Sequence, residues 1–574
     1  MTQSDGSRTR LVGHLLLLIV VVAVRWLLHE PTEMFPVLAP EIPDTWWSGL
    51  VGSHDWLLHG FDQGEWLALV NAYLDGSTSH VTRPPAYPLL AALLAKVVGH
   101  RVLALHLVGH IASVLVCLAT YALGTRLASR SVGVGAALLV ATAPRVVSVQ
   151  NEIGAFPVLV LALLCLMSAA HATASRPTLS RGVWLGLAGG FCLSAHYTSA
   201  PFVLPGFLLV ALFAGRRAFR PLLLATSIAV LFAGTLYATV PAQSVHSGQV
   251  DLVKFYTHAL NHPDGRDLKI VPATGTGMRQ KFPHRRPELL SSRGHIGRTF
   301  VKGPLAAARS MAEGYGPGSL APVVVGLMLL GIVWPAKRER SGRLDRWKAS
   351  LWLATGLGPL LYAAASLQGD PDHRYLSFSV PFAALAFARG VGQCGLWARR
   401  WVGPIMATGL AAVPLGLVLV GQTAAQLPAE VPPRHLQIQQ HALAQEIRAH
   451  FGTGGTIVGP TGQMGPIASY AALARRDVCS LGSGGGTCLD GHALRGSLAE
   501  CVQALLDHCV DGEATPYVLD LFHLGHPLDK QTTALHDALQ ERLQPTLSQQ
   551  AHERVIVVYA LDPASLRALA ADVR

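Results

Sequence analysis

Residues 102–123 read VLALHLVGHIASVLVCLATYAL and contain no Asp, Glu, Lys or Arg. A stretch of about 20 mainly apolar residues has the length of a membrane-spanning helix. The whole chain of 574 residues shares this character, because 51% of its residues are hydrophobic, only 14% are charged and its mean hydropathy is +0.37. Ordinary soluble domains carry about 25% charged residues. The composition therefore predicts a membrane protein and excludes disordered, collagen-like and small disulfide-rich classes.

Further apolar runs, each bounded by charged or Gly/Pro-rich segments, bring the predicted number of spans to about eleven. The first run lacks a small-residue cleavage site and continues through Arg25 and Trp26, so we expect an uncleaved anchor rather than a secretory signal. The predicted fold class is an α-helical polytopic membrane protein. The predicted spans are residues 11–28, 102–123, 132–149, 153–170, 183–197, 200–214, 221–240, 320–334, 351–367, 375–388 and 402–420.

Basic residues gather in every second loop between successive spans, so these loops lie on the same side of the membrane. Cytoplasmic loops carry such an excess of Lys and Arg, so we expect these loops and the N-terminus to face the cytoplasm. The larger outer segments are then residues 29–88, residues 243–318 and the tail after Gly421. The basic residues are Arg8, Arg10, Arg126, Arg130, Arg176, Arg181, Arg216, Arg217, Arg220, Lys337, Arg338, Arg340, Arg343, Arg346, Lys348, Arg399 and Arg400.

The formal net charge is +11 and the isoelectric point is about 9.4. No RNA- or DNA-binding module pattern is present, so we expect no nucleic-acid partner. The expected partner is anionic membrane lipid or a phosphate. A basic cluster in the second large loop is either a solvated patch near the headgroups or part of a phosphate site, and consists of Arg279, Lys281, Arg285 and Arg286.

The C-terminal tail differs in composition from the predicted membrane part. Residues 427–433 form a Pro-rich linker, and residues 438–450 have helical periodicity. Helical stretches are also expected at 466–475 and 528–543. Short apolar strands are expected at residues 456–459, 517–521 and 555–560.

These elements predict a membrane domain over residues 1–423 and a small extracytoplasmic α/β domain over residues 424–574. The tail also holds four of the eight cysteines, which an oxidising compartment would allow to pair. The sequence does not decide which of these cysteines pair. They are Cys479, Cys488, Cys501 and Cys509.

The first outer loop contains FDQGEWLALVNAYLDG at residues 61–76. Its apolar residues recur at helical spacing, which predicts an amphipathic helix suited to lying on the bilayer surface. Asp62 stands at the start of this helix. It is either an N-cap that forms a capping box with Glu65 or a general base held at the outer membrane surface. The apolar residues are Trp66, Leu69, Val70, Tyr73 and Leu74.

The segment TRPPAYPLL follows at residues 82–90. Its two consecutive prolines predict an extended turn that leads into the apolar stretch 87–98. Arg83 precedes them and has two open interpretations. It either reaches toward the lipid headgroups or binds a lipid-borne phosphate, for which the guanidinium fork is well shaped.

These two segments, together with Leu123-Gly-Thr-Arg126, residues 141–144 and Asp372-His-Arg-Tyr375, resemble the polytopic GT-C glycosyltransferases. Within that fold the sequence is most similar to the bacterial protein mannosyltransferase-like and aminoarabinose transferase-like enzymes. The resemblance covers about residues 10–400. It implies a polyprenyl-phosphate sugar donor, an active site at the outer face of the bacterial inner membrane and inversion at the anomeric carbon. The implied acceptor is a lipid, a glycan or a protein.

The resemblance also implies roles for individual residues. Asp62 matches the first-loop acid that takes the acceptor's proton. Arg83 matches the basic residue near the donor phosphate. Arg374 and Tyr375 match the late Arg-Tyr pair that enters a span at the outer face, and they would bind the same phosphate.

Three further residues complete the predicted site. Glu152 lies near the position of another acid in the family, where it would orient the acceptor or simply favour a helix N-terminus. We group Glu65 with Asp62 and Glu152 as candidate catalytic carboxylates. His196 stands where the family often carries Lys or Arg, so it either replaces that phosphate ligand or is an interfacial residue.

No residue pattern demands a metal or another cofactor, although a divalent metal remains possible. His106 and His110 lie one helical turn apart, but no third ligand is evident.

The main alternative from another functional class is a lipid or polysaccharide transporter or flippase. Such a protein is expected to place ionisable residues inside its spans and to show paired halves with interrupted helices. Most charges of this chain lie in its predicted loops instead. A non-catalytic envelope-assembly protein is the other alternative, because a transferase that has lost its chemistry keeps its hydrophobic pattern.

Overall fold

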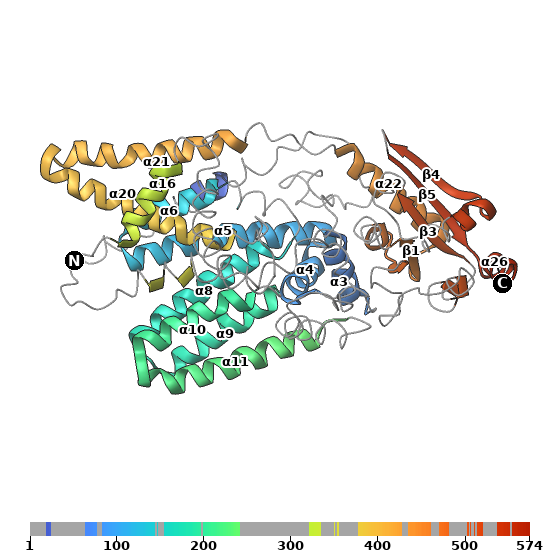
Figure 1. Ribbon diagram of the computed structural model, residues 1–574, viewed down its shortest axis with the longest axis horizontal. Coiled ribbons are helices and arrows are strands. Elements are labelled where there is room, and N and C mark those ends of the chain that lie inside the picture. Colours follow the sequence, from blue (N-terminus) through green and yellow to red (C-terminus); the bar gives the residue numbers. More distant parts are fainter. Residues whose placement is uncertain are drawn as a thin grey trace, which may run out of the picture. The chain divides into compact units, whose positions relative to one another are not determined.

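The computed structural model is mainly helical and contains one five-stranded sheet near the C-terminus (Figure 1). Two predicted spans, 11–28 and 351–367, lie largely outside the described residues. The structure describes residues 16, 19–24, 63–76, 83–143, 146, 154–196, 199–241, 321–333, 349–350, 353–354, 377–426, 434–460, 470–481, 502–503, 505–506, 510, 514–520, 537–551 and 554–573.

The chain divides into two compact units. The first unit contains residues 1–32, 107–237 and 292–431. The second unit groups the tail with earlier parts of the chain, namely residues 33–106, 238–291 and 432–574. The domain boundary expected at residue 424 cuts the chain differently, and it stays a prediction.

The first unit is a bundle of apolar helices. Four described helical stretches are long and apolar enough to cross a membrane, at residues 101–127, 156–175, 202–238 and 404–422. The described helices are α5 (Arg101–Leu127), α6 (Arg130–Thr142), α8 (Phe156–Ser175), α9 (Leu179–Ala195), α10 (Ala200–Ala214), α11 (Phe219–Ala238), α16 (Ala321–Val333), α20 (Val380–Val402) and α21 (Pro404–Gln426). The described residues of this unit also form the 3-10 turns η2 (Gly215–Ala218) and η6 (Ser377–Ser379).

Several predicted spans differ from these helices at their ends. The span expected at 132–149 ends as α6 at Thr142, because Ala143 precedes a proline and takes the extended conformation. The span expected at 375–388 is replaced by α20, which begins at Val380 and runs on to Val402. The number of eleven spans stays a prediction.

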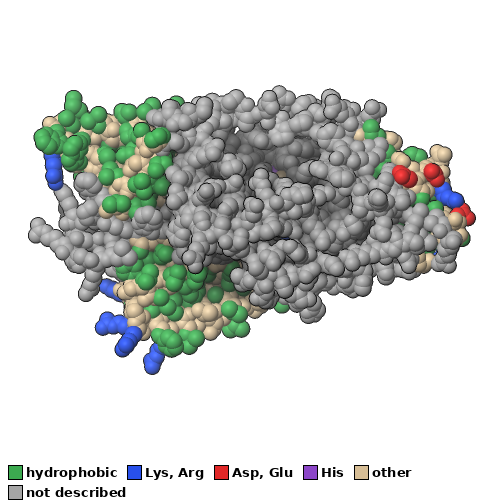
Figure 2. Space-filling model, viewed as in Figure 1, with side chains coloured by type: hydrophobic (Ala, Val, Ile, Leu, Met, Phe, Trp, Pro, Cys, Tyr) green, Lys and Arg blue, Asp and Glu red, His purple; other side chains and the backbone are tan. Residues whose placement is uncertain are grey.

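Arginines mark one set of helix ends in the first unit. Arg126 lies in the last turn of α5, and Arg399 and Arg400 lie in the last turn of α20. The η2 turn between α10 and α11 carries Arg216 and Arg217. Figure 2 shows Lys and Arg side chains at the ends of helices whose sides are covered by hydrophobic side chains. This distribution is typical of membrane spans joined by basic loops.

A stripe of small residues packs α9 against α11. A Cβ atom at Gly182 would lie 2.6 Å from the carbonyl oxygen of Pro221, and one at Gly186 would lie 2.6 Å from that of Ala225. Both helices advance by four residues between these contacts, so they run parallel and α10 returns the chain between them. Small residues allow such close backbone approach between helices in a membrane.

We expect Gly186→Leu to destabilise the protein by about 1–3 kcal/mol or more, because the added side chain has no room against the α11 backbone. The measurement is thermal unfolding of the purified protein in detergent. Gly234→Leu in α11 is the matched control, because it makes the same change where an added Cβ atom would meet nothing within 4 Å. Equal melting temperatures for the two variants would show that this stripe does not hold the helices together.

The second unit contains two short helices from the first outer loop, α3 (Gln63–Asp75) and α4 (Ala86–Val98), and the first turns of α5. It also contains the tail elements. These are α22 (Arg434–Phe451), β1 (Thr456–Pro460), β2 (Asp477–Leu481), β3 (Thr515–Asp520), β4 (Pro545–Ala551), β5 (Arg554–Leu561) and α26 (Pro563–Val573).

The strands of the tail form one mixed sheet in the order β2-β1-β3-β5-β4. Strands β2, β1 and β3 are parallel, whereas β5 pairs antiparallel with both β3 and β4. The expected strands at 456–459, 517–521 and 555–560 correspond to β1, β3 and β5. The helix expected at 438–450 corresponds to α22.

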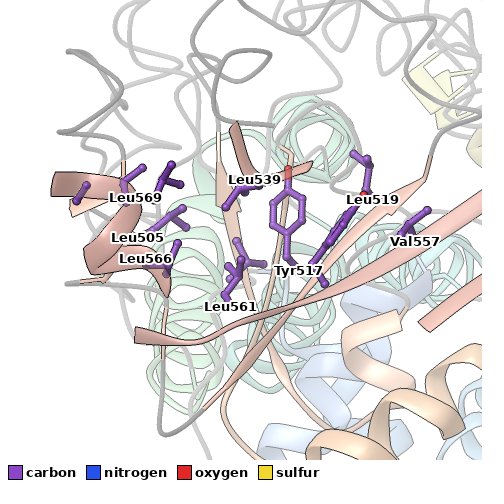
Figure 3. Close-up of a cluster of buried hydrophobic side chains, with 12 residues drawn as sticks. Leu505, Tyr517, Leu519, Leu539, Val557, Leu561, Leu566 and Leu569 are labelled. Carbon is purple, nitrogen blue, oxygen red and sulfur yellow. The ribbon is translucent and has the colours of Figure 1, made fainter. Parts of the chain in front are cut away.

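Each face of the sheet has its own hydrophobic core. On one face, Tyr517, Leu519 and Leu561 pack with Leu566 and Leu569 of α26 (Figure 3). The opposite face buries Val518, Ile556 and Val558 against α22. Because neighbouring residues of one strand alternate between the faces, the apolar runs of β3 and β5 supply both cores.

Candidate functional site

The predicted first-loop helix is present as α3, which begins at Gln63, immediately after Asp62. Asp62 itself lies outside the described residues. The buried surface of α3 is wider than its apolar stripe. The polar residues Gln63, Glu65 and Asn71 are buried as well as Trp66. The helix is therefore embedded in the protein, and its expected place at the bilayer surface stays a prediction.

Arg83 and Glu65 form a buried ion pair in the second unit. The Nε and Nη2 atoms of Arg83 both contact Oε2 of Glu65. Only 9% of Arg83 and 7% of Glu65 is exposed. This burial does not fit the interpretation in which Arg83 reaches out to the lipid headgroups. A buried ion pair costs about 3–5 kcal/mol to break by removing one partner, because the other charge is left uncompensated.

Aromatic side chains support the same arginine. The guanidinium carbon of Arg83 lies 5.6 Å from the centre of the Trp66 ring, within reach of a cation–π interaction. Trp66 packs edge-on against Tyr87 of α4, with 5.2 Å between the ring centres. The Tyr87 hydroxyl donates a hydrogen bond of 3.0 Å to the carbonyl oxygen of Leu105 in α5. Three helices thus fix the environment of one guanidinium group.

His196 lies in the first unit and is buried in an aromatic cluster. Its ring stacks on Phe156 with 5.2 Å between the ring centres. The ring centres of Phe156 and Phe378 are 6.1 Å apart. Phe378 packs edge-on against Phe202, with 4.8 Å between the ring centres. The aromatic cluster joins the end of α9 to the starts of α8 and α10 and to η6.

This aromatic cluster includes residues that closely follow two other candidates in the sequence. Phe156 comes four residues after Glu152, and Phe378 comes four residues after Arg374. Four residues span at most about 14 Å of extended chain. Glu152, Arg374 and Tyr375 themselves lie outside the described residues, so their positions stay predictions.

In the described part of the chain, no group of three or more His, Cys, Asp or Glu side chains is placed to hold a metal ion. The basic cluster at residues 279–286 and the cysteines at 488, 501 and 509 lie outside the described residues.

The sequence did not reveal how Arg83 is held. Glu65 and Trp66 are 18 and 17 residues away from Arg83, so the sequence alone does not show that they are close in space. The capping-box interpretation drew attention to the spacing of Glu65 from Asp62, whereas the structure shows the Glu65 carboxylate on Arg83. A carboxylate on a helix face rich in Trp and Leu was the signal available, because such a group needs a cationic partner when buried.

Known proteins provide an independent comparison. Residues 82–241 match the family described as dolichyl-phosphate-mannose-protein mannosyltransferase. No match to a curated protein sequence was found. The fold is similar to that of ArnT from Cupriavidus metallidurans bound to undecaprenyl phosphate, with a TM-score of 0.56 and 12% identity over 95% of this chain and 97% of that one. The apo structure of the same protein gives a TM-score of 0.54 at 11% identity, over 96% and 98% of the two chains.

A second similar structure is the archaeal oligosaccharyltransferase AglB from Archaeoglobus fulgidus, in complex with an inhibitory peptide and a dolichol-phosphate. Its TM-score is 0.51 at 13% identity, over 88% of this chain and 69% of that one. The chain therefore has the fold of ArnT and AglB, and the resemblance seen in the sequence is confirmed as a likeness of fold and as a family match over residues 82–241.

Proposed function

We propose that this protein is a membrane glycosyltransferase that moves a sugar from a polyprenyl-phosphate donor to an acceptor hydroxyl at the extracytoplasmic face. The observation that carries the proposal is the buried Arg83, which lies in the segment that matches the mannosyltransferase family and is fixed by Glu65 and Trp66 from the preceding helix. ArnT, which has the same fold, was crystallised with undecaprenyl phosphate. A fixed guanidinium group is well suited to bind such a phosphate.

The proposed reaction is a single displacement. Asp62 takes the proton of the acceptor hydroxyl, whose oxygen attacks the anomeric carbon from the side opposite the phosphate. The bond between that carbon and the phosphate oxygen breaks, and the electron pair leaves with polyprenyl phosphate. One displacement inverts the configuration at the anomeric carbon. Arg83 stabilises the negative charge that develops on the leaving phosphate.

The other candidates have supporting roles in this proposal. Arg374, Tyr375 and His196 bind the donor phosphate, and Glu152 orients the acceptor. Glu65 acts on Arg83 by fixing its charge and direction, so we assign it a positioning role. The enzyme is proposed to lie in the bacterial inner membrane with its N-terminus in the cytoplasm.

The proposal predicts that loss of the protein leaves its donor unused. In a strain lacking the gene, one polyprenyl-phosphate sugar should accumulate and one envelope glycan, glycolipid or glycoprotein should lose that sugar. The measurement is mass spectrometry of lipid-linked sugars and of envelope glycans. Complementation with the wild-type gene should restore both pools, whereas the Asp62→Asn gene should restore neither. Equal restoration by the two genes would contradict a transferase role that depends on Asp62.

A further inference from the structure

The end of α3 opposite the buried ion pair is tied to the C-terminal tail. Within the second unit, Nδ2 of Asn71 donates a buried hydrogen bond of 2.8 Å to the carbonyl oxygen of Ala472, a residue 401 positions later in the chain. Asn71 is itself buried, with 8% of its surface exposed. Breaking such a bond would leave a buried polar group unsatisfied, which makes the contact costly to lose.

Arg101 completes this connection from a third segment. Its Nη1 atom donates a 2.8 Å hydrogen bond to Oδ1 of Asn71. The same guanidinium group contacts both carboxylate oxygens of Asp75, at 2.7 Å and 2.5 Å. The hydrogen bonds from Arg101 hold the pKa of Asp75 below its usual value. Both ends of the Asn71 amide thus have complementary partners, since its oxygen accepts from a guanidinium group and its nitrogen donates to a carbonyl.

The receiving carbonyl group is held in place by the tail itself. The backbone N–H of Arg475 also donates to the carbonyl oxygen of Ala472, at 3.3 Å. The neighbouring Arg476 donates from Nη1 to the carbonyl oxygens of Phe451 at 2.8 Å and Gly452 at 3.0 Å. The Ala472 turn is therefore fastened to the end of α22 and leads directly into β2 at Asp477.

The two polar contacts of α3 lie close together along the helix. Asn71 comes six residues after Glu65, which corresponds to about 9 Å along the axis of an α-helix. A helix this short is stiff over that length, so a change in its position at Asn71 moves Glu65 as well. Glu65 in turn contacts Arg83.

We infer that Asn71 and Arg101 are positioning residues, through which the C-terminal tail holds α3 and thereby keeps Arg83 oriented for the lipid phosphate. The inference rests on the proposed function for the role of Arg83. Asn71 and Arg101 contact neither donor nor acceptor in this proposal, and they act through Glu65. The tail is then part of the donor site's support, in addition to anything that it binds.

The test compares single variants of the full-length protein in detergent. Asn71→Asp keeps the oxygen that accepts from Arg101 but loses the N–H groups that donate to Ala472. Arg101→Gln removes the ion pair with Asp75, and Arg101→Lys restores the charge without the fork. Arg542→Gln is the matched control, because it removes a guanidinium group from the exposed Arg542–Asp572 ion pair of the same unit.

Two quantities are measured for each variant: hydrogen exchange of the α3 amides and affinity for undecaprenyl phosphate. We expect exchange in α3 to rise about tenfold in Asn71→Asp and Arg101→Gln, as for loss of one buried hydrogen bond. Affinity should fall several-fold in both. Arg101→Lys should recover part of each loss, and Arg542→Gln should match the wild type. A melting curve for each variant confirms that the bundle and the sheet remain folded.

Unchanged exchange in α3 would overturn the inference, and so would faster exchange with unchanged affinity. Failure of the proposed function gives a different result. If Arg83→Gln binds undecaprenyl phosphate as tightly as the wild type, the donor-site assignment of Arg83 is wrong. If Arg83→Gln loses binding while the Asn71 and Arg101 variants retain it, only the positioning role is lost.

Discussion

Asp62→Asn is expected to reduce sugar transfer by about a hundredfold to ten-thousandfold while leaving the protein folded. The amide is nearly the same size as the carboxylate but cannot accept the proton of the acceptor hydroxyl. General-base catalysis contributes about 10²–10⁴-fold to a rate, so its loss should dominate kcat rather than the KM for the donor. The measurement is conversion of a polyprenyl-phosphate sugar to polyprenyl phosphate by the purified protein.

A matched variant separates this effect from a general response to losing one carboxylate. Asp572→Asn makes the same chemical change in an exposed ion pair with Arg542, where 53% of the aspartate side chain is exposed. Exposed ion pairs contribute little to stability, so this variant should keep wild-type turnover. Full activity in Asp62→Asn would show that Asp62 is not the general base. The N-cap interpretation would then account for an aspartate at the start of α3.

Arg83→Gln is the second variant with a large expected effect. It should both weaken donor binding and slow transfer, with a combined effect of about a hundredfold. The reason is that Arg83 is proposed to bind the phosphate before and during its departure. The substitution should also destabilise the protein by about 3–5 kcal/mol, because the Glu65 carboxylate would remain buried without its guanidinium partner. Donor KM, kcat and thermal unfolding are measured on the same preparation.

The double variant Glu65→Gln/Arg83→Gln separates stability from chemistry. Removing both charges leaves no uncompensated carboxylate, so much of the lost stability should return. Activity should not return, since no guanidinium group remains for the phosphate. Arg83→Lys should retain the charge but lose the bidentate geometry, giving intermediate activity. Recovery of transfer in the double variant would show that Arg83 serves only the fold.

Much of the helical architecture could be predicted from the sequence, because runs of apolar residues report directly on burial in lipid. The span expected at 200–214 has the same bounds as α10. The ends were harder to predict where local backbone chemistry overrode hydropathy, as at Ala143 before Pro144. Strand β4 was missed, because its sequence PTLSQQA lacks the apolar alternation that marks a strand buried on one side.

The candidate site shows a different limit. A short motif was enough to select Arg83, since a basic residue before two prolines is distinctive. Its partners were not predictable in the same way, because Glu65 and Arg83 are 18 residues apart in the sequence and meet only in the folded protein. Asn71 and Ala472 are still farther apart in sequence, and neither residue type stands out by composition. Single-sequence patterns describe local geometry and burial, whereas these contacts depend on tertiary pairing.

The long separation between Asn71 and Ala472 also has a consequence during biosynthesis. Ribosomes add about 5–20 residues per second, so the 401 positions between them require roughly 20–80 s of translation. Throughout that interval the newly made α3 has no Ala472 carbonyl to bind. A nascent or prematurely terminated chain would therefore already contain Arg83, yet it would lack the contact through which the tail is inferred to support that residue. Full affinity for the donor should therefore appear only after Ala472 has been made.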